Sequence, residues 1–489
     1  MPGMRSRRVN QKIAVGVVYV AALFMAIMDT TIVNVALPVL GRDFHTSPDA
    51  VDSVVIGFLV STGVFLTASG WLGDRFGGRK VLLVSVVLFT ASSALCGLAT
   101  SLGELVVFRV LQGAAGGLMT PVGMAMLFRV FPPAERVRAS SILMIPTAFA
   151  PALGPVLGGL LVTDLSWRWV FYVNVPVGVI AVIFGALFLD DHVQAHPGRF
   201  DRTGFLLAAG GLGLVMYGVS EGPLKGWASS GVLSTMVAGA ALLVAMVFVE
   251  LRTVQPLVDL RVYGDRLFRS TSVVLTLGAV AFLGVLFMVA LFYQDGLHLT
   301  ALQSGLNTFP EAVGVLIGAQ VVSRRLYPVF GPRRIMAGGL SLVAAAMACM
   351  SLIGAGTSLW WARALMLAIG LGMSCVFIPA QAASFATISP ERTGRASTLF
   401  NAARQLGGAV GVAVLTTVLA AVGPTRLSAG RIVSNLGAYH AAFLAAAAVA
   451  VVAMVGAFSV SDQEAAATMV RRGRLAARRP PSPAAVEVA

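Results

Sequence analysis

Long apolar stretches recur along almost the whole chain, separated by short polar segments. Each stretch is long enough to cross the roughly 30 Å hydrocarbon core of a bilayer as an α-helix. Only 11% of the 489 residues are charged, against about 25% in a typical soluble domain. The stretches are continuous rather than alternating, which excludes a transmembrane β-barrel. The sequence therefore predicts an all-α polytopic membrane protein. We place its fourteen transmembrane helices near residues 13–38, 51–72, 80–100, 104–130, 138–162, 170–189, 203–221, 231–250, 269–293, 304–324, 333–354, 359–386, 396–422 and 439–460.

Positive charge is distributed unevenly between the two sides of this membrane topology. Most of the 35 Lys and Arg residues fall on one side if the N-terminus is cytoplasmic. By the positive-inside rule, we expect a plasma (inner) membrane protein with both termini in the cytoplasm, including basic tails at 1–12 and 461–489. The net charge of +14 then reflects topology and contacts with anionic membrane lipids, not binding of nucleic acid. The three cysteines lack metal or redox spacing, so no metal site is expected.

The second half of the chain repeats the first. Residues 76–80 (FGGRK) match residues 330–334 (FGPRR), and Arg109 matches Arg363 at the same offset, about 254 residues. Several matches in one order indicate a duplicated six-helix bundle, as in many secondary transporters, whose substrate site lies between the repeats. We assign 13–190 to the N-terminal six-helix bundle, 203–250 to two extra linker helices and 269–460 to the C-terminal six-helix bundle.

The source of energy follows from what the sequence contains. It has neither a Walker A motif nor a soluble segment long enough for an ATPase. We therefore expect no cofactor, with energy supplied by an ion gradient, and a chain that works as a monomer. Nothing in the sequence resembles the selectivity filter or charge ring of a channel.

Asp29 interrupts the first apolar stretch. A carboxylate at that depth costs roughly 2.5–3.5 kcal/mol unless it is protonated, hydrated or paired. Arg109, in the fourth predicted helix, lies at a compatible depth in the outer half of the membrane. An arginine cannot discharge usefully, so it requires a counter-charge or a hydrated cavity. We predict that the two interact directly, through Gln112 or through water. The pair is a proton-coupling site, a static ion pair that holds two helices together, or both.

The loop between the second and third predicted helices, residues 70–80, is called the latch loop below. It reads Gly-Trp-Leu-Gly-Asp-Arg-Phe-Gly-Gly-Arg-Lys. Its glycines permit a tight turn and close approach of helices. Its carboxylate can accept hydrogen bonds from a helix N-terminus or an arginine. We favour a conformational latch over a simple positive-inside anchor. The candidate latch residues are Gly70, Asp74, Arg75, Gly77 and Arg79.

These segments together resemble the major facilitator superfamily, and specifically its fourteen-helix drug:proton antiporter branch. The latch loop is similar to the family's signature loop, and residues 109–117 (RVLQGAAGG) are similar to its R-x-x-q-G pattern. Residues 29–38 and 167–176 add to the likeness to the fourteen-helix branch. Residues 150–159 resemble the antiporter motif, and the resemblance implies that they form a hinge that favours antiport. The candidate hinge residues are Pro151, Gly154, Pro155, Gly158 and Gly159. The alternative is ordinary packing of a glycine-rich membrane helix.

Further polar residues within the predicted helices are candidates for the substrate cavity. Glu311 either neutralises a cationic substrate or carries a second proton, or it is a hydrated acid near the external mouth. Arg363 is the repeat partner of Arg109, but Leu283 stands where the partner of Asp29 would be, so proton coupling is expected mainly in the N-terminal half. The candidate cavity residues are Asn34, Gln112, Glu311, Arg363, Arg404 and Gln405.

The sequence thus predicts a membrane transporter and not an enzyme. The expected function is proton-coupled multidrug efflux by alternating access, in which amphipathic cationic or neutral drugs leave in exchange for protons. Two alternatives stay open. One is a dedicated exporter of a single natural product or lipid, and the other is a membrane sensor that transports nothing.

Overall fold

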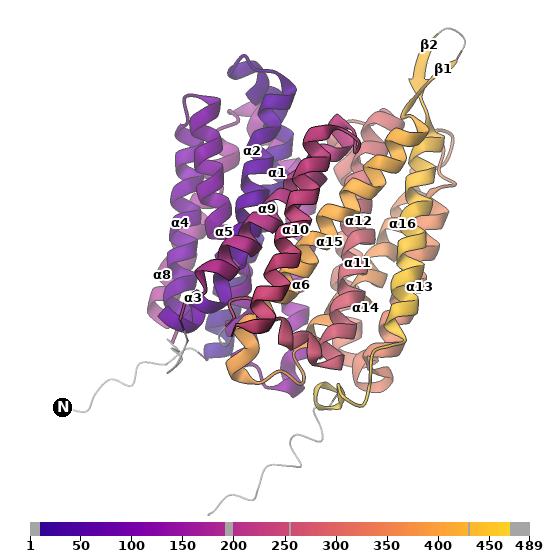
Figure 1. Ribbon diagram of the computed structural model, residues 1–489. Helices are drawn as coiled ribbons and strands as arrows, with labels where there is room; N and C mark the ends of the chain where they lie inside the picture. The colour runs from indigo at the N-terminus through magenta and orange to yellow at the C-terminus, as the bar shows by residue number, and fades with distance from the viewer. Residues whose placement is uncertain (1–9, 191–198, 254–255, 429–430, 470–489) are drawn as a thin grey trace, which may run out of the picture.

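The computed structural model describes residues 10–190, 199–253, 256–428 and 431–469, and the helices of this part run roughly parallel in two adjacent groups (Figure 1). Most of the predicted tails, residues 1–9 and 470–489, lies outside the described residues. From here on, lower and upper describe positions in the view of Figure 1. The latch loop lies at the lower end and a β-hairpin at the upper end.

The first group of helices is connected by short turns. It consists of α1 (Gln11–Asp43), α2 (Pro48–Leu66), α3 (Ser69–Phe76), α4 (Gly78–Leu98), α5 (Leu102–Val130), η1 (Pro133–Glu135), α6 (Arg136–Asp164), α7 (Trp169–Tyr172) and α8 (Asn174–Phe188). Side chains of Ser47 and Ser101 accept hydrogen bonds at the starts of α2 and α5, which satisfies backbone N–H groups that have no partner within the helix.

Two helices, α9 (Arg202–Lys225) and α10 (Ser230–Arg252), follow the first group and pack against each other. In Figure 1 they cross the front of the molecule between the two groups. Helix α9 contacts α2 of the first group and α15 of the second. Just beyond α9, Trp227 Nε1 donates a 2.6 Å hydrogen bond to Thr417 Oγ1 on α15. The inserted pair therefore contacts both groups.

The second group completes the architecture. It comprises η2 (Leu260–Gly264), α11 (Arg266–Leu291), η3 (Phe292–Gly296), α12 (Ala301–Val321), η4 (Val322–Leu326), α13 (Tyr327–Met350), α14 (Leu359–Ser384), η5 (Pro390–Arg392), α15 (Thr393–Val422), α16 (Leu436–Ala457) and η6 (Ala466–Thr468). Between α15 and α16 lies an antiparallel hairpin of β1 (Thr425–Ser428) and β2 (Arg431–Ser434), with Thr425 opposite Ser434. The all-α class and the arrangement of two bundles with two inserted helices are confirmed.

The number of membrane spans depends on how broken helices are counted. The described residues contain 12 helices that are long and apolar enough to span, or up to 13 if a bent pair counts as one. One of the 12, Leu302–Met350, has 49 residues, which is more than twice the roughly 20 that a bilayer requires. It breaks at Gly331, whose φ is 74°. If this helix is divided there and the bent pair counts as one span, the described residues hold fourteen spans. The number fourteen stays a prediction.

Three local features differ from the predicted elements. The single helix expected at 51–72 is two helices, α2 and α3, bent by 54°. The helix expected at 170–189 is interrupted at Val173 between α7 and α8. The hairpin β1–β2 was not predicted, because its eight residues carry no turn signal strong enough to separate a short hairpin from a loop.

The internal repeat is visible in the backbone. Gly77 in the latch loop has a φ of 88°, and Gly331, its repeat partner, has a φ of 74°. Glycine is favoured at both positions because a side chain is strained in that region of backbone space. The side chain of Asp462 accepts a 2.9 Å hydrogen bond from the backbone N–H of Arg333, just after the second turn. The two halves therefore share a turn but surround it with different polar groups.

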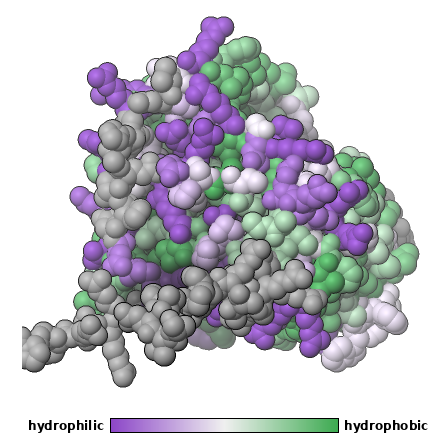
Figure 2. Space-filling model, turned by 90° about the horizontal axis from the view of Figure 1, so that it is seen from below, coloured by the Kyte–Doolittle hydropathy of each residue, from purple (hydrophilic) through white to green (hydrophobic). Residues whose placement is uncertain are grey.

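The surface agrees with a membrane environment. Large apolar side chains such as Ile180, Leu187 and Trp360 are more than 60% exposed. Hydrophilic side chains gather on the face seen from below, while apolar ones surround it (Figure 2). A flank this apolar is stable against lipid and not against water.

Candidate functional site

Asp29 and Arg109 are brought together in the interior of the first bundle. Arg109 Nη1 lies 2.5 Å from Asp29 Oδ2, and both side chains are almost completely buried. Gln112 Nε2 donates to Asp29 Oδ1 at 2.9 Å, and its Oε1 accepts from Arg109 Nη1 at 2.7 Å. Asn174 Nδ2 also donates to Asp29 Oδ1, at 3.1 Å. The interaction predicted between Asp29 and Arg109 is thus direct and also bridged by Gln112.

The surrounding helices fix the position of the guanidinium. Arg109 Nε donates to the carbonyl oxygen of Val54 at 3.3 Å, and the guanidinium carbon lies 4.2 Å from the centre of the Phe58 ring. Both partners are on α2, which approaches α5 closely because Gly113 has no side chain. A Cβ at Gly113 would collide with the carbonyl of Phe58. The glycines after Arg109 therefore allow α2 to close over the ion pair.

The cluster balances charge without external help. One carboxylate faces one guanidinium, and two amides supply the remaining hydrogen bonds. A proton placed on Asp29 would remove the negative charge and leave Arg109 buried without a counter-charge. Buried charges are strongly coupled to their partners because little solvent screens them. The charge on Asp29 and the burial of Arg109 are therefore strongly coupled to each other.

Two members of this polar cluster, Asn174 and Ser93, were not predicted from the sequence. Asn174 begins α8 and also donates to Ser93 Oγ of α4 at 3.1 Å. Ser93 in turn donates to the carbonyl of Phe171 at 2.8 Å. An isolated Asn in an apolar helix was the available signal, but sequence alone does not place α8 beside α1. Asn34, predicted to line the cavity, is exposed and lies outside the cluster.

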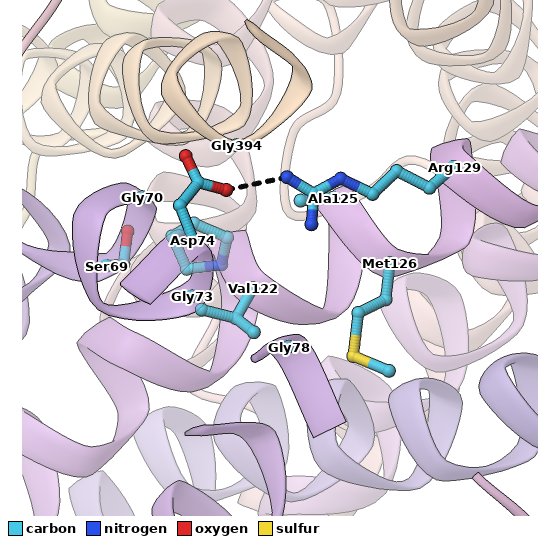
Figure 3. Close-up of a pocket in the computed structure, with 11 residues that line it drawn as sticks. Ser69, Gly70, Gly73, Asp74, Gly78, Val122, Ala125, Met126, Arg129 and Gly394 are labelled. Carbon is cyan, nitrogen blue, oxygen red and sulfur yellow. Dashed lines mark hydrogen bonds and ion pairs between the residues drawn. The ribbon is translucent and has the colours of Figure 1, made fainter. Parts of the chain in front are cut away.

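Asp74 of the latch loop lies at the lower end of the molecule, facing Arg129 at the end of α5. Arg129 Nη2 is 2.7 Å from Asp74 Oδ1 (Figure 3). Asp74 is also close to the N-terminal turn of α15, since a Cβ at Gly394 would lie 3.1 Å from Asp74 Oδ1. The carboxylate therefore meets an arginine and a helix N-terminus, the two partners expected from the sequence.

The other latch residues divide into two kinds. Gly70 packs directly on α15, because a Cβ there would lie 2.9 Å from Thr398 Oγ1. Arg79 Nη2 donates to the carbonyl of Ala186 at 2.6 Å, which joins α4 to α8 within the first bundle. Arg75 is exposed. Gly70 and Asp74 thus lie at the contact between bundles, whereas Arg75 and Arg79 do not.

The boundary between the two bundles, called the seam below, is closed in its lower half. Ser69 and Thr398 form a 3.0 Å hydroxyl hydrogen bond across it. Ser397 Oγ donates to the carbonyl of Pro121 at 2.7 Å. Phe128 and Phe385 stack with ring centres 4.6 Å apart. The structure therefore represents a state that is shut on the side of the latch loop.

The candidate hinge motif lies directly against the helix that carries Asp29. A Cβ at Gly154 would collide with Thr31, and one at Gly158 would lie 3.1 Å from the Ile32 side chain. Gly159 faces open space, with nothing within 4 Å. Pro151 is partly buried, and α6 continues as an α-helix through the motif. Pro155 lies in this helix, but its side chain is outside the described set. Two of the glycines therefore fix the distance from α6 to α1.

Candidate cavity residues of the second bundle are separate from the polar cluster. Arg363 Nε donates to Asn307 Oδ1 at 2.8 Å and not to a carboxylate. Glu311 on α12 is 3% exposed. Within the described residues it has neither an ion pair nor a side-chain hydrogen bond. Arg404 and Gln405 on α15 are partly buried. The described residues include no group of three or more His, Cys, Asp or Glu able to hold a metal ion.

Comparison with known proteins identifies the family. The model of the Major Facilitator Superfamily matches residues 19–412. The multidrug resistance protein B homolog of Mycobacterium tuberculosis strain H37Rv is 32% identical over 407 residues, 82% of this chain and 75% of that protein. The tetracenomycin C resistance and export protein of Streptomyces glaucescens is 33% identical over 424 residues, 86% of this chain and 77% of that protein.

A solved structure extends the likeness to the fold. The crystal structure of the human organic anion transporter MFSD10 matches with a TM-score of 0.65 at 16% identity, and the match covers 91% of this chain and 99% of that chain. At this identity the likeness concerns the fold alone. With the family model matching most of its length, this chain belongs to the major facilitator superfamily and is a multi-pass membrane transporter, not an enzyme.

Proposed function

We propose that this chain is a proton-driven multidrug exporter of the plasma (inner) membrane. The relatives named for multidrug resistance and for tetracenomycin C export support the efflux direction. The observation that carries the proton coupling is the buried ion pair between Asp29 and Arg109, at 2.5 Å. The lower end is taken as cytoplasmic, with both termini there, and the transporter works as a monomer without a cofactor.

The proposed cycle links the protonation of Asp29 to the latch. With Asp29 ionised, the polar cluster holds α1, α5 and α8 together. A proton that enters from outside neutralises Asp29 and releases Arg109 from its counter-charge. The resulting shift of α1 is transmitted to α6 through Gly154 and Gly158, which pack on it. Opening the lower end then requires separation of Asp74 from the start of α15.

The gradient supplies enough energy for this work. One charge that moves through 100 mV supplies about 2.3 kcal/mol. One pH unit adds about 1.4 kcal/mol, since this is the free energy of a tenfold concentration ratio. Two protons per cycle would therefore support a substrate gradient of several orders of magnitude.

The test uses purified protein in proteoliposomes that carry a fluorescent amphipathic dye. An imposed pH gradient should drive dye transport, and an uncoupler should stop it. A static ion pair would instead be essential for stability but not for coupling. The decisive variant is therefore Asp29→Asn in a preparation that is shown to remain folded. Coupled transport by that variant would assign the proton to another group.

A dedicated exporter of one natural product is the second candidate. The named activity of the Streptomyces glaucescens relative favours it, because that protein is described for a single compound. A panel of chemically unrelated dyes and antibiotics separates the two functions. Export of several scaffolds supports multidrug efflux, and export of one scaffold alone supports the dedicated function.

A further inference from the structure

Arg404 occupies a particular level of the seam, directly above the closed lower contacts. On α15 it follows Ser397 and Asn401 at helical spacing, so the three share one face. Ser397 donates to the carbonyl of Pro121, and Asn401 Nδ2 lies 3.3 Å from the sulfur of Met124. Arg404 is the next residue on this face, one turn farther from the latch loop than Asn401.

Tyr19 on α1 faces Arg404 from the first bundle. The two residues share one level of the seam, because Tyr19 packs on Gly123, whose neighbour Met124 contacts Asn401 one turn before Arg404. The Tyr19 ring packs on the backbone of α5 at Gly123, where a Cβ would collide with it. Its hydroxyl is buried and has no hydrogen-bond partner among the described residues. Tyr19 is thus held firmly while its polar atom is left unused.

Arg404 differs from Arg109 and Arg363, which also lie within predicted membrane helices. Arg109 is matched by Asp29, and Arg363 donates to Asn307. Within the described residues, Arg404 has neither an ion pair nor a hydrogen bond. Tyr19 offers a hydroxyl but not a counter-charge. A partly buried arginine in a membrane protein requires an anion or a hydrated space. The fold therefore places an unmatched positive charge and an unused hydroxyl donor on opposite sides of the seam.

We propose that Arg404 and Tyr19 form an anion-recognition site for one end of the transported substrate. The inference rests on the proposed export function and deepens it by naming a substrate class. That class is amphipathic aromatic compounds with a carboxylate, phenolate or sulfonate group. A guanidinium presents five N–H donors in a planar fork, which suits the two oxygens of such a group. The Tyr19 hydroxyl supplies one further donor from the opposite bundle.

This site adds anionic compounds to the cationic and neutral substrates expected from the sequence. Glu311 on α12 belongs to the same bundle as Arg404, is 3% exposed and, within the described residues, likewise has no ion pair. A substrate with an acidic end would engage Arg404, and one with a basic end would engage Glu311. Because Tyr19 and Arg404 belong to different bundles, they can contact the same substrate group only when the seam holds them close together.

The experiment compares two dyes that share a xanthene scaffold and differ in charge. Fluorescein is anionic and rhodamine 6G is cationic. Binding of each to detergent-purified protein is measured by fluorescence polarisation for wild type, Arg404→Gln, Arg404→Lys and Tyr19→Phe. The control is Arg42→Gln, which removes one positive charge from an exposed position at the upper end of α1. Export of both dyes under a pH gradient is measured in proteoliposomes.

We expect Arg404→Gln to weaken fluorescein binding about tenfold or more, as for loss of a hydrogen bond to a charged group. Rhodamine 6G binding should change by less than about threefold, as expected for a dye that makes no charged hydrogen bond there. Arg404→Lys should keep part of the fluorescein affinity, since it keeps the charge but loses the fork. Tyr19→Phe should weaken fluorescein selectively and to a smaller degree.

Three results would overturn the inference. Equal losses for both dyes would show that Arg404 acts only on structure. Unchanged fluorescein binding in Arg404→Gln would place the anion elsewhere. Wild type that exports rhodamine 6G but neither binds nor exports fluorescein would remove the anionic class and leave the proposed export function intact. Wild type that exports neither dye under the gradient would contradict the export function itself.

Discussion

Replacement of Asp29 by Asn should produce two separable effects, loss of proton coupling and loss of stability. The substitution keeps the size of the side chain but removes its charge. Arg109, only 1% exposed, would keep the oxygens of Gln112 and Val54 as acceptors and lose its only counter-charge in the polar cluster. Breaking a buried pair from one side typically costs about 3–5 kcal/mol, because the remaining charge is uncompensated.

The reverse substitution should be milder. In Arg109→Gln the carboxylate of Asp29 keeps its two amide donors, Gln112 and Asn174. A carboxylic acid can also take up a proton and become neutral, whereas arginine cannot discharge. The expected loss is about 1–3 kcal/mol, the range for an unsatisfied buried polar group. The double variant Asp29→Asn/Arg109→Gln is neutral and should be more stable than Asp29→Asn alone.

The assay has two parts. Thermal unfolding in detergent ranks the stability of wild type, both single variants and the double variant. Transport of a cationic dye in proteoliposomes is then measured with and without a pH gradient. The variants with Asn at position 29 should lose the response to the gradient, including the double variant whose stability is restored. Recovery of stability without recovery of coupling separates the proton site from a static ion pair.

Two outcomes would refute the reasoning. If the stability losses of the single variants simply add in the double variant, the two side chains are not coupled in the folded protein. If Asp29→Asn still accumulates dye against its gradient when a pH difference is applied, Asp29 is not the coupling residue. In that case Glu311 would be the next acid to substitute.

Three further predictions follow from the other contacts. Asp74→Asn should favour opening of the lower end by about 1–3 kcal/mol, a typical coupling energy, because it weakens the 2.7 Å pair with Arg129. Distances between spin labels on the lower ends of α5 and α15 should then lengthen. An unchanged distance distribution would contradict the latch. Gly154→Ala should lower thermal stability and transport, because the added Cβ collides with α1. Gly159→Ala should behave as wild type, because no atom lies within 4 Å of a Cβ there. Equal effects of the two substitutions would count against specific packing. Glu311→Gln should weaken binding of cationic dyes by about tenfold, as for a lost hydrogen bond to a charged group. Binding of anionic dyes is the control. Unchanged binding of cationic dyes would show that Glu311 is not a substrate site.

Much of the fold was predictable because the bilayer restricts the choices. Continuous apolar stretches can be satisfied only as helices, and the matched residues 76–80 and 330–334 revealed the duplication. The turn glycines Gly77 and Gly331 show that this match extends to backbone conformation. The break between α2 and α3 was not predicted, since residues 64–69 (VFLTAS) contain neither a proline nor a charged residue to mark a helix end.

The site was predictable where the chemistry is unusual in its surroundings. An acid and an arginine in apolar helices each require a counter-charge. Their similar depth in the membrane was enough to pair Asp29 with Arg109. Asn174 was missed because a neutral amide creates no such need. Its contact with Asp29 depends on how α8 packs on α1, a tertiary arrangement that spacing along the chain does not encode.

The inserted helices have a mechanical consequence. Helix α9 contacts both α2 and α15, and Trp227 is hydrogen-bonded to Thr417 across the upper part of the molecule. When two bodies rock about a shared axis, an element fastened to both must slide, bend or release one attachment. By these contacts α9 would act as a tether that limits how far α2 and α15 can part. The extra pair of helices would thus set the amplitude of the rocking motion, and with it the largest molecule that can pass.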